Sequence, residues 1–307
     1  MRRPIGRIVA LLSVAASAAL AAQSYVPQRV FDTGRGAFSD FEAMAADLAR
    51  ADVVFVGEQH DDPNTHRLEL AVLEALARRG RDVIVSLEMF ERDAQEPLEH
   101  FLMGHSSEED FLKVSRPWPR YLTDYKPLVD FAAAHDWAVV AANVPRPIAS
   151  EIAKGGLDVL QQKSEADRKL FAADLKCPTD DEYFKRFAEA MGDHPAAGAA
   201  ADAADEARRT TERYYFSQCV KDETMAESIA QAHTVGHAGD RKPTLVHFNG
   251  AFHSDFGQGT AARVKRRLPT ARIVVISVKP VRDLDALAPT DDDKRVGEYV
   301  VYTVGRR

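Results

Sequence analysis

The sequence is poor in cysteine, has fewer basic than acidic residues, and after its first twenty residues has no long apolar run. Its 307 residues include two cysteines, too few for a disulfide-dense scaffold or a zinc site of four thiolates. A net charge of −7 disfavours a general nucleic-acid binder, which needs a basic surface. No later segment approaches the length that spans a membrane. With 45% hydrophobic and 28% charged residues, the composition is that of a globular protein.

The first 21 residues have the pattern of a cleaved signal peptide. Three arginines precede the uncharged apolar run at 8–20, and a small-x-small sequence ends at Ala21, where we expect cleavage. A membrane anchor is the alternative, but the run is short for that purpose. No cysteine follows the run, so we expect no lipid anchor and predict a periplasmic or secreted protein. Residues 22–307 are then a single domain.

If the protein is exported, its two cysteines, Cys177 and Cys219, are in an oxidising compartment. In an oxidising compartment an even number of cysteines favours a disulfide, here closing a loop of about 40 residues. Two unpaired buried thiols are the alternative, because sequence gives no distance between them. Both interpretations stay open at this stage.

Short apolar segments alternate with helical patterns along most of the chain. We predict buried strands at 53–56, 83–87, 138–142, 244–248 and 273–278, and a last strand at an edge, 298–304. Helical patterns lie at 66–79, 93–104, 126–135 and 259–267. This alternation predicts an α/β fold, a mostly parallel central sheet flanked by helices. Residues 147–235 lack a convincing strand and predict a helical insertion over the carboxyl edge of the strands, with a flexible surface connection at 192–204.

Polar residues follow four of the predicted strands. Carboxyl ends of parallel strands share one edge of a sheet, where ligands of open α/β sheets bind. We therefore expect these residues to converge: Glu58, His60, Glu88, Asn143, Arg146, His247, Asn249 and His253. Glu88 directly follows an apolar strand and needs a partner if buried, and Arg146 is available for that. Taken singly, each has a plain alternative, such as a helix cap or an exposed loop position.

Two further segments carry aromatic and polar side chains. From Tyr214 onward, one face of a predicted helix combines apolar groups with Tyr215, Gln218 and Asp222. These polar groups bind either a ligand or neighbouring loops. A proline-stiffened loop holds Arg116, Trp118, Arg120 and Tyr121, which could wall a flat ligand, or Trp118 could fill a small core under that loop.

Taken together, these motifs resemble the ChaN-like haem-binding proteins, in the superfamily that also holds the TraB and Tiki proteins and the erythromycin esterases. The matching elements span about residues 40–280: Gly57-Glu58-Gln59-His60, Leu87-Glu88-Met89-Phe90, Trp118 to Ala132, Asn143-Val144-Pro145-Arg146, Tyr214 to Ala226 and Asn249-Gly250-Ala251-Phe252-His253. The resemblance implies haem binding for iron acquisition, with haem-transport components as partners and a homodimer as an open question.

A haem site needs an axial ligand to iron, apolar walls and cations for the propionates. Tyr215 and Tyr214 are the first candidates for the axial ligand, because a phenolate is a hard donor suited to ferric iron, and His253 and His60 come next. The remaining candidates are three arginines for the propionates and two aromatic walls: Arg116, Arg120, Arg146, Trp118 and Phe252.

Two other functions compete with haem binding. Glu58, His60, Glu88 and His253 could hold Zn²⁺, Mn²⁺ or Fe²⁺ in a metal-dependent hydrolase, as the esterase branch of the superfamily suggests. The sequence has no G-x-S-x-G element, which argues against a serine hydrolase. A non-catalytic interaction protein that keeps only the fold is the third possibility.

Overall fold

The computed structural model describes residues 26–192 and 201–305. The predicted signal peptide therefore lies outside the described residues, as does the part of the predicted surface connection at 193–200. Residues 201–204, which we expected in that connection, instead begin a long helix.

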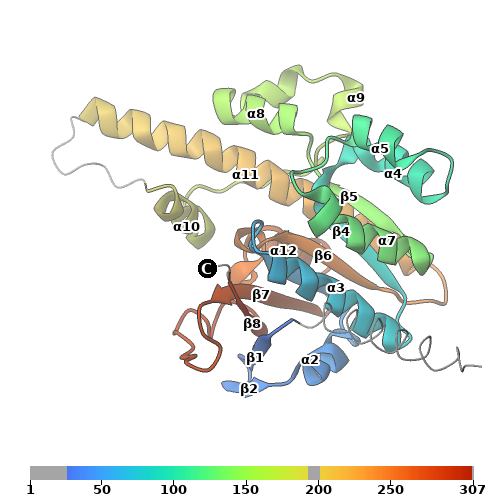
Figure 1. The fold of residues 1–307 in the computed structure, drawn as a ribbon. Coiled ribbons are helices and arrows are strands. Elements are labelled where there is room, and N and C mark those ends of the chain that lie inside the picture. Colours follow the sequence, from blue (N-terminus) through green and yellow to red (C-terminus); the bar gives the residue numbers. More distant parts are fainter. Residues whose placement is uncertain (1–25, 193–200, 306–307) are drawn as a thin grey trace, which may run out of the picture.

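An eight-stranded sheet in the order β2-β1-β8-β7-β3-β6-β4-β5 forms the centre (Figure 1). The strands are β1 (Gln28–Asp32), β2 (Ala37–Ser39), β3 (Val53–Glu58), β4 (Val83–Glu91), β5 (Val139–Asn143), β6 (Thr244–Gly250), β7 (Ile273–Val281) and β8 (Tyr299–Val304). The six strands from β8 to β5 are parallel, which confirms the predicted fold class. The predicted edge position of 298–304 is wrong, because β1 pairs antiparallel with β8 and covers its outer side. The two antiparallel strands went unpredicted, since they are short and lack a continuous apolar run.

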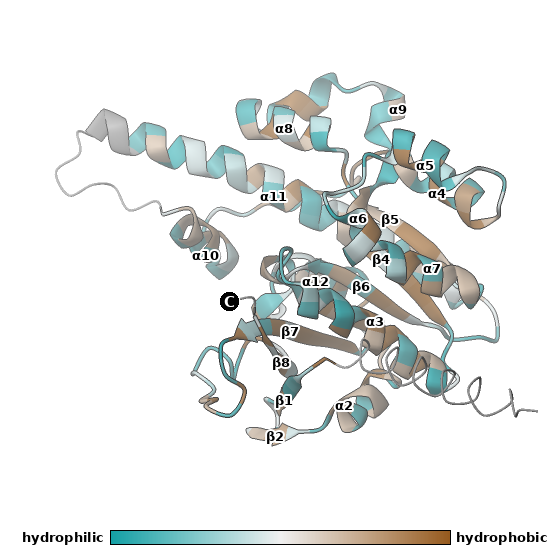
Figure 2. Ribbon diagram, in the orientation of Figure 1, coloured by the Kyte–Doolittle hydropathy of each residue, from teal (hydrophilic) through white to brown (hydrophobic). Residues whose placement is uncertain are grey.

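The strands alternate between two cores, one on each face of the sheet. On β3, Val54 and Val56 pack with α2 (Phe41–Leu48), α3 (Pro63–Arg78) and α7 (Lys126–Ala134). Val53 and Phe55 face the opposite way, toward the carboxyl half of α11 (Ala201–Gly236) and toward α12 (Gly259–Arg267). Figure 2 shows the apolar strands enclosed by helices whose outer faces are hydrophilic. The central strands read as continuous apolar runs because both of their faces are covered.

The connections after β4 and β5 contain the remaining helices, which are α4 (Gln95–Leu102), α5 (Glu108–Ser115), α6 (Tyr121–Asp124), α8 (Arg146–Gly155), α9 (Glu165–Arg168) and α10 (Glu182–Ala190). Short 3₁₀ turns lie at Arg92–Ala94, Leu157–Gln162, Ala251–His253 and Asp255–Gly257. No helix in the described ranges combines the length and apolar character needed to cross a membrane.

The predicted helical insertion consists of α8 to α11. Only part of it lies at the carboxyl edge of the strands: the first half of α11 extends past that edge beside α10, whereas its second half covers a face of the sheet (Figure 1). The predicted placement over the edge is therefore correct for α10 and the start of α11 alone. A 36-residue helix cannot stay within one edge of a small sheet, since it is about 54 Å long at 1.5 Å per residue.

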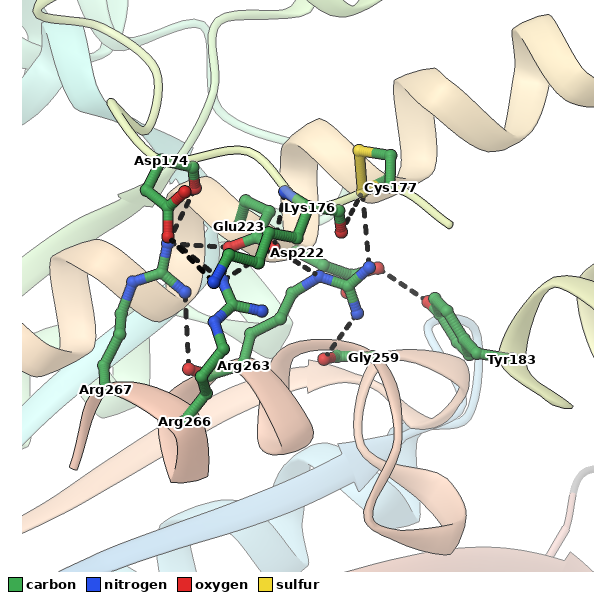
Figure 3. The surroundings of a disulfide bond; sticks show 11 residues. Asp174, Lys176, Cys177, Tyr183, Asp222, Glu223, Gly259, Arg263, Arg266 and Arg267 are labelled. Atoms are coloured by element: carbon green, nitrogen blue, oxygen red, sulfur yellow. Dashed lines mark hydrogen bonds and ion pairs between the residues drawn. A yellow bond between two sulfur atoms is a disulfide. The ribbon is translucent and has the colours of Figure 1, made fainter. Parts of the chain in front are cut away.

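A disulfide and an arginine cluster fix α11 in this position (Figure 3). Cys177, in the loop before α10, is bonded to Cys219 of α11, as one of the two interpretations predicted. Arg266 and Arg267 of α12 each reach Oε2 of buried Glu223 at 2.6 Å. Arg263 of the same helix lies 3.3 Å from Oε1 of Glu223, and the three arginines can surround one carboxylate because i and i+3 or i+4 positions share a helix face. These contacts hold Asp222, the neighbour of Glu223, against the end of β6.

Candidate functional site

The carboxyl ends of β3, β4 and β6 bring Glu58, His60, Glu88 and His253 together, as the parallel topology predicts. Glu58 ends β3, Glu88 lies in β4, and His253 closes the 3₁₀ turn that follows β6. Gly250 separates the two carboxylate–histidine pairs. A Cβ there would lie 2.8 Å from Cε1 and Nε2 of His60 and 3.7 Å from Oε2 of Glu88. The bare Cα of this glycine is what allows the His60 ring to pack against the strand end.

The first pair orients His60. Its Nδ1 lies 2.5 Å from Oε1 of buried Glu58, and the hydroxyl of Tyr125 donates to the same oxygen at 2.7 Å. Burial acts to raise the pKa of Glu58, but hydrogen bonds from His60 and Glu69 and the nearby histidine charges lower it overall. An ionised Glu58 requires the proton on Nδ1, which leaves the lone pair of His60 on Nε2.

His60 is half-exposed, with 51% of its side chain open to solvent. Burial acts to lower its pKa, yet the hydrogen bond to Glu58 and the negative charges of Glu88 and Glu58 raise it overall. In metal sites, a ligating histidine often donates one ring N–H to a carboxylate and binds the metal through its other nitrogen. The hydrogen bond to the carboxylate orients the ring and makes the second nitrogen more basic.

The second pair is fully enclosed. His253 bonds through Nδ1 to Oδ1 of Asp222 at 2.7 Å and faces Oε1 of Glu88 through Nε2 at 3.2 Å. Burial acts to lower the pKa of His253, but the flanking charges of Glu88 and Asp222 raise it to about 10. The imidazole is therefore protonated on both nitrogens at neutral pH and has no lone pair to give. This environment argues against the predicted role of His253 as an iron or metal ligand and makes it an internal counter-ion.

Sequence reasoning missed a buried acidic cluster beneath His60. His66 of α3 bonds through Nδ1 to Glu69 at 2.9 Å and through Nε2 to the carbonyl oxygen of His60 at 3.2 Å, with Asp124 at 3.5 Å. Burial and the charge of Glu58 raise the pKa of Glu69 well above its usual value. His and Glu three residues apart on the inward face of a helix were the available signal.

The residues predicted to hold a metal ion are not the ones whose donor atoms converge in the structure. Glu58, His66 and Glu69 bring one donor atom each within 4.8 Å of one another, whereas Glu58, His60, Glu88 and His253 form two separate pairs. Oε2 of Glu58 and Oε1 of Glu69 receive no hydrogen bond from any other residue, and the raised pKa of Glu69 lets its carboxyl donate a proton to Glu58. All three members of this group are buried, so a bound ion there would have no open coordination position toward solvent.

The predicted cations lie nearby but have carboxylate partners. Arg146 bonds to Oε1 of Glu91 at 2.6 Å and Arg116 to Oε2 at 2.7 Å. The expected pairing of Arg146 with Glu88 is therefore wrong. β4 continues four residues further than predicted, and Glu91 is the carboxylate in reach. Arg120 pairs with Asp124 at 2.7 Å and donates to the carbonyl oxygen of His60.

The predicted aromatic residues lie in two places. Trp118 stands edge-on to the His60 ring, with 5.0 Å between ring centroids. It also packs partly against the core, as one interpretation of this residue expects, and its role as a wall for a flat ligand stays a prediction. Tyr215 is fully buried among Tyr183, Phe184 and Phe187, and Phe252 adjoins this cluster. Burial raises the pKa of Tyr215 to about 12, and its hydroxyl has no hydrogen-bond partner.

A buried phenol of this kind cannot reach an iron outside the cluster without rearrangement of α10, so the structure disfavours Tyr215 as the axial ligand. Tyr214 is 46% exposed and remains accessible.

The other polar residues near this edge form hydrogen bonds or close contacts within the protein. Asn143 donates to the carbonyl oxygen of Glu88 at 3.1 Å, and Asn249 donates to that of Gly250 at 2.8 Å. Gln218 lies 3.3 Å from the ring of His253. Nδ1 of His247 lies 2.9 Å from the hydroxyl oxygen of Ser86, and burial lowers the pKa of His247 to about 3, so it stays neutral.

A large cavity of about 1190 Å³ lies elsewhere, along the outer edge of β5 between α4 and α11. Its walls are mainly apolar, with Leu102, Trp137, Val139 and Phe171 among them. Its lining contains no histidine, tyrosine or cysteine, and Met103 is its one sulfur donor. Volume alone would place a flat ligand there, but the ligand chemistry favours the edge that carries His60.

Known proteins share the fold of this chain. The chain of the ChaN protein from Campylobacter jejuni, in a structure described as cofacial haem binding, superposes with a TM-score of 0.63. The identity is 16%, over 91% of this chain and 97% of that one, which supports the fold. A mutant of erythromycin esterase EreC in its open conformation gives a TM-score of 0.43 at 12% identity, over 87% of this chain and 80% of the other, a likeness too weak for argument.

By sequence, the chain is 23% identical over 279 residues to the chloroplastic protein RETICULATA-RELATED 5 of Arabidopsis thaliana. The match covers 84% of this chain but only 35% of that protein, so this chain spans about a third of its relative. The model of the family described as haem-binding uptake, Tiki superfamily, ChaN matches residues 44–264. Because this match includes β3 to α12 and every strand end described above, the chain belongs to the ChaN family of haem-binding uptake proteins.

Proposed function

We propose that this protein binds haem at the carboxyl edge of its parallel strands, with Nε2 of His60 as the axial ligand to iron. The observation that carries the proposal is the Glu58–His60 pair, in which a buried carboxylate fixes the tautomer of a half-exposed imidazole. Membership of a haem-binding family and the fold shared with a haem-binding ChaN structure support it.

The surroundings of His60 fit a porphyrin in chemical character. Trp118, beside the imidazole, offers an aromatic wall. Arg116 and Arg146 keep 43% and 52% of their side chains exposed while paired with Glu91, so guanidinium donors remain for propionates. Haem brings a ferric iron that accepts a basic nitrogen donor, and Glu58 makes the His60 imidazole more basic.

Haemin titration followed by the Soret band tests the proposal. His60→Ala should weaken binding by more than about 100-fold, since even loss of a second-shell partner costs 10–100-fold. Glu58→Gln, which keeps a hydrogen bond but loses the charge, should weaken it by about 10-fold or more. His135→Ala is the matched control, because His135 is also an exposed histidine but lies at the end of α7.

Tyr214→Phe belongs in the same series, because Tyr214 is the accessible one of the two predicted tyrosine ligands. Unchanged binding in His60→Ala together with loss in Tyr214→Phe would assign the axial ligand to the tyrosine and contradict the proposal.

We further propose that the protein is exported and serves haem acquisition, delivering haem to transport components. The basic and apolar pattern before Ala21 supports export, and so does the disulfide, which persists in oxidising compartments. Amino-terminal sequencing of the protein from its native host should begin close to residue 22. A sequence that begins at Met1 in a cytosolic fraction would contradict export.

Metal-dependent hydrolysis is a second candidate, favoured by Glu58, His66 and Glu69, which bring one donor atom each within 4.8 Å of one another. Because all three are buried, hydrolysis there requires the loop that carries His60 to move and admit substrate. It predicts one equivalent of a first-row metal in the purified protein, lost in Glu69→Gln, together with an esterase activity. Haem binding predicts neither, so metal analysis of this variant separates the two functions.

A further inference from the structure

We infer that the end of α11 and the start of β3 form a second ligand site, which binds a divalent first-row transition metal through His233, His237 and Asp52. This site lies at the amino-terminal edge of the sheet, opposite the edge that carries His60. One nitrogen of each histidine and one oxygen of the aspartate lie within 4.8 Å of one another. Each residue is only partly buried, so an ion from solution can reach the site.

The two histidines are positioned by helix geometry. His233 and His237 are four residues apart, and their rings stack with 3.9 Å between centroids and 20° between planes. Side chains at i and i+4 lie one above the other on a helix, which is how paired histidines hold zinc in helical motifs. In a tetrahedral zinc site with bonds of 2.0–2.1 Å the ligand atoms are about 3.4 Å apart. Small side-chain rotations therefore close the present arrangement around an ion.

The hydrogen bonds leave ligand nitrogens available. Nδ1 of His237 lies 3.0 Å from the carbonyl oxygen of His233, and since a carbonyl only accepts, Nδ1 carries the proton and Nε2 the lone pair. A backbone carbonyl on the second nitrogen is a usual outer partner of a ligating histidine. Nε2 of His233 is buried and has no hydrogen-bond partner. Because a buried polar atom normally has a partner, this unpartnered nitrogen indicates that a ligand binds here.

The carboxylate is fixed by the sheet. Oδ2 of Asp52 accepts a bond from the backbone nitrogen of Arg272 at 2.7 Å, and the backbone of Asp52 bonds to Leu245 and to Arg272 on the neighbouring strands. The site also lies at the carboxyl end of α11, where the helix dipole favours a cation.

The donor set selects the class of ion. Two imidazoles and one carboxylate suit Zn²⁺, Co²⁺, Ni²⁺ or Cu²⁺, whereas Ca²⁺ and Mg²⁺ prefer oxygen ligands. Lys242 does not occupy the site, because its ammonium donates to the carbonyl oxygen of His237 at 2.6 Å. Three protein ligands leave at least one coordination position for water or for a group from a partner.

Zinc titration of the untagged, haem-free protein against a chelating indicator tests the inference. We expect one equivalent to bind, and His237→Ala or His233→Ala to weaken it by more than about 100-fold. Asp52→Asn, which keeps the acceptor for Arg272, should weaken it as well. His135→Ala is the matched control, since Nδ1 of His135 also bonds to the carbonyl oxygen four residues earlier, at 2.9 Å, at a helix end.

Cobalt provides a second readout that does not depend on affinity alone. The visible d–d absorption of bound Co²⁺ should disappear in His237→Ala, whereas the Soret band of the haemin complex should be unchanged. Zinc binding that survives in His233→Ala and His237→Ala but is lost in Glu69→Gln would place the ion in the buried group under His60 and overturn the inference. Absence of zinc binding in the wild-type protein would overturn it too, without affecting haem binding.

Discussion

Raising the pH from 7 to 9 should destabilise this protein through one buried residue, His253. Its folded pKa is raised to about 10 by Glu88 and Asp222, against the opposing effect of burial. An unfolded histidine titrates near pH 6.5. The stability that comes from this raised pKa is therefore fully present below pH 6.5 and is lost as the pH rises through 10.

The magnitude follows from the difference between the two pKa values. At 1.36 kcal/mol per unit, the full contribution is about 5 kcal/mol, and about 2–3 kcal/mol of it should disappear between pH 7 and pH 9. His60 and Glu69, whose pKa values are also raised, act in the same direction, and comparison with His253→Gln separates their part from that of His253. His247, with its pKa lowered to about 3, affects stability below pH 6.5, and the buried tyrosines, with raised pKa values, act above pH 10.

Urea unfolding at pH 7, 8 and 9, followed by the fluorescence of the two tryptophans, measures this change. The free energy of unfolding should fall by about 1.4 kcal/mol per pH unit at its steepest. His253→Gln should be less stable at pH 7 and should lose most of the pH dependence. If that variant does not fold, Asp222→Asn should lower the pH at which the stability is lost.

A free energy of unfolding that stays constant between pH 7 and pH 9 would refute the reasoning. So would a His253→Gln variant with the same pH dependence as the wild-type protein, because another group would then be responsible for it.

Four further outcomes follow from the same structure. Gly250→Ala places a methyl group 2.8 Å from the His60 ring and should weaken haemin binding and lower stability by about 1–3 kcal/mol, as measured by titration and urea unfolding. Replacing Cys177 and Cys219 by serine should cost about 4 kcal/mol in the chain-entropy model, visible as a lower urea midpoint. Tyr215→Phe removes an unpartnered hydroxyl and should leave both stability and haemin binding unchanged, whereas lost binding would restore it as a ligand. Haemin affinity should fall as the pH decreases through the raised pKa of His60, because a proton then competes with iron for Nε2.

The sequence predicted the parallel core because its strands are apolar on both faces. Val53 to Val56 alternate between two cores, and a run of four apolar residues is what such burial requires. The order of the strands could not be read from periodicity, and neither could the position of β8, since pairing with β1 depends on contacts between the two ends of the chain.

The convergence of Glu58, His60, Glu88 and His253 followed from topology alone, because parallel strands end at one edge. The different surroundings of the two histidines could not be predicted in this way. His60 bonds to one carboxylate and keeps a nitrogen exposed, whereas His253 is buried between two carboxylates, and both arrangements depend on contacts between distant segments. Tyr215 illustrates the same limit: its helical face was predicted, but α10 covers it through contacts that no local pattern reveals.

A structure of the protein crystallised with haemin tests the central claim most directly. The account predicts a haem at the carboxyl edge of the strands, with its iron bonded to Nε2 of His60 and Trp118 beside the porphyrin. A haem bound in the cavity along β5, or an iron bonded to a tyrosine while His60 stays at Glu58 without contact, would contradict it.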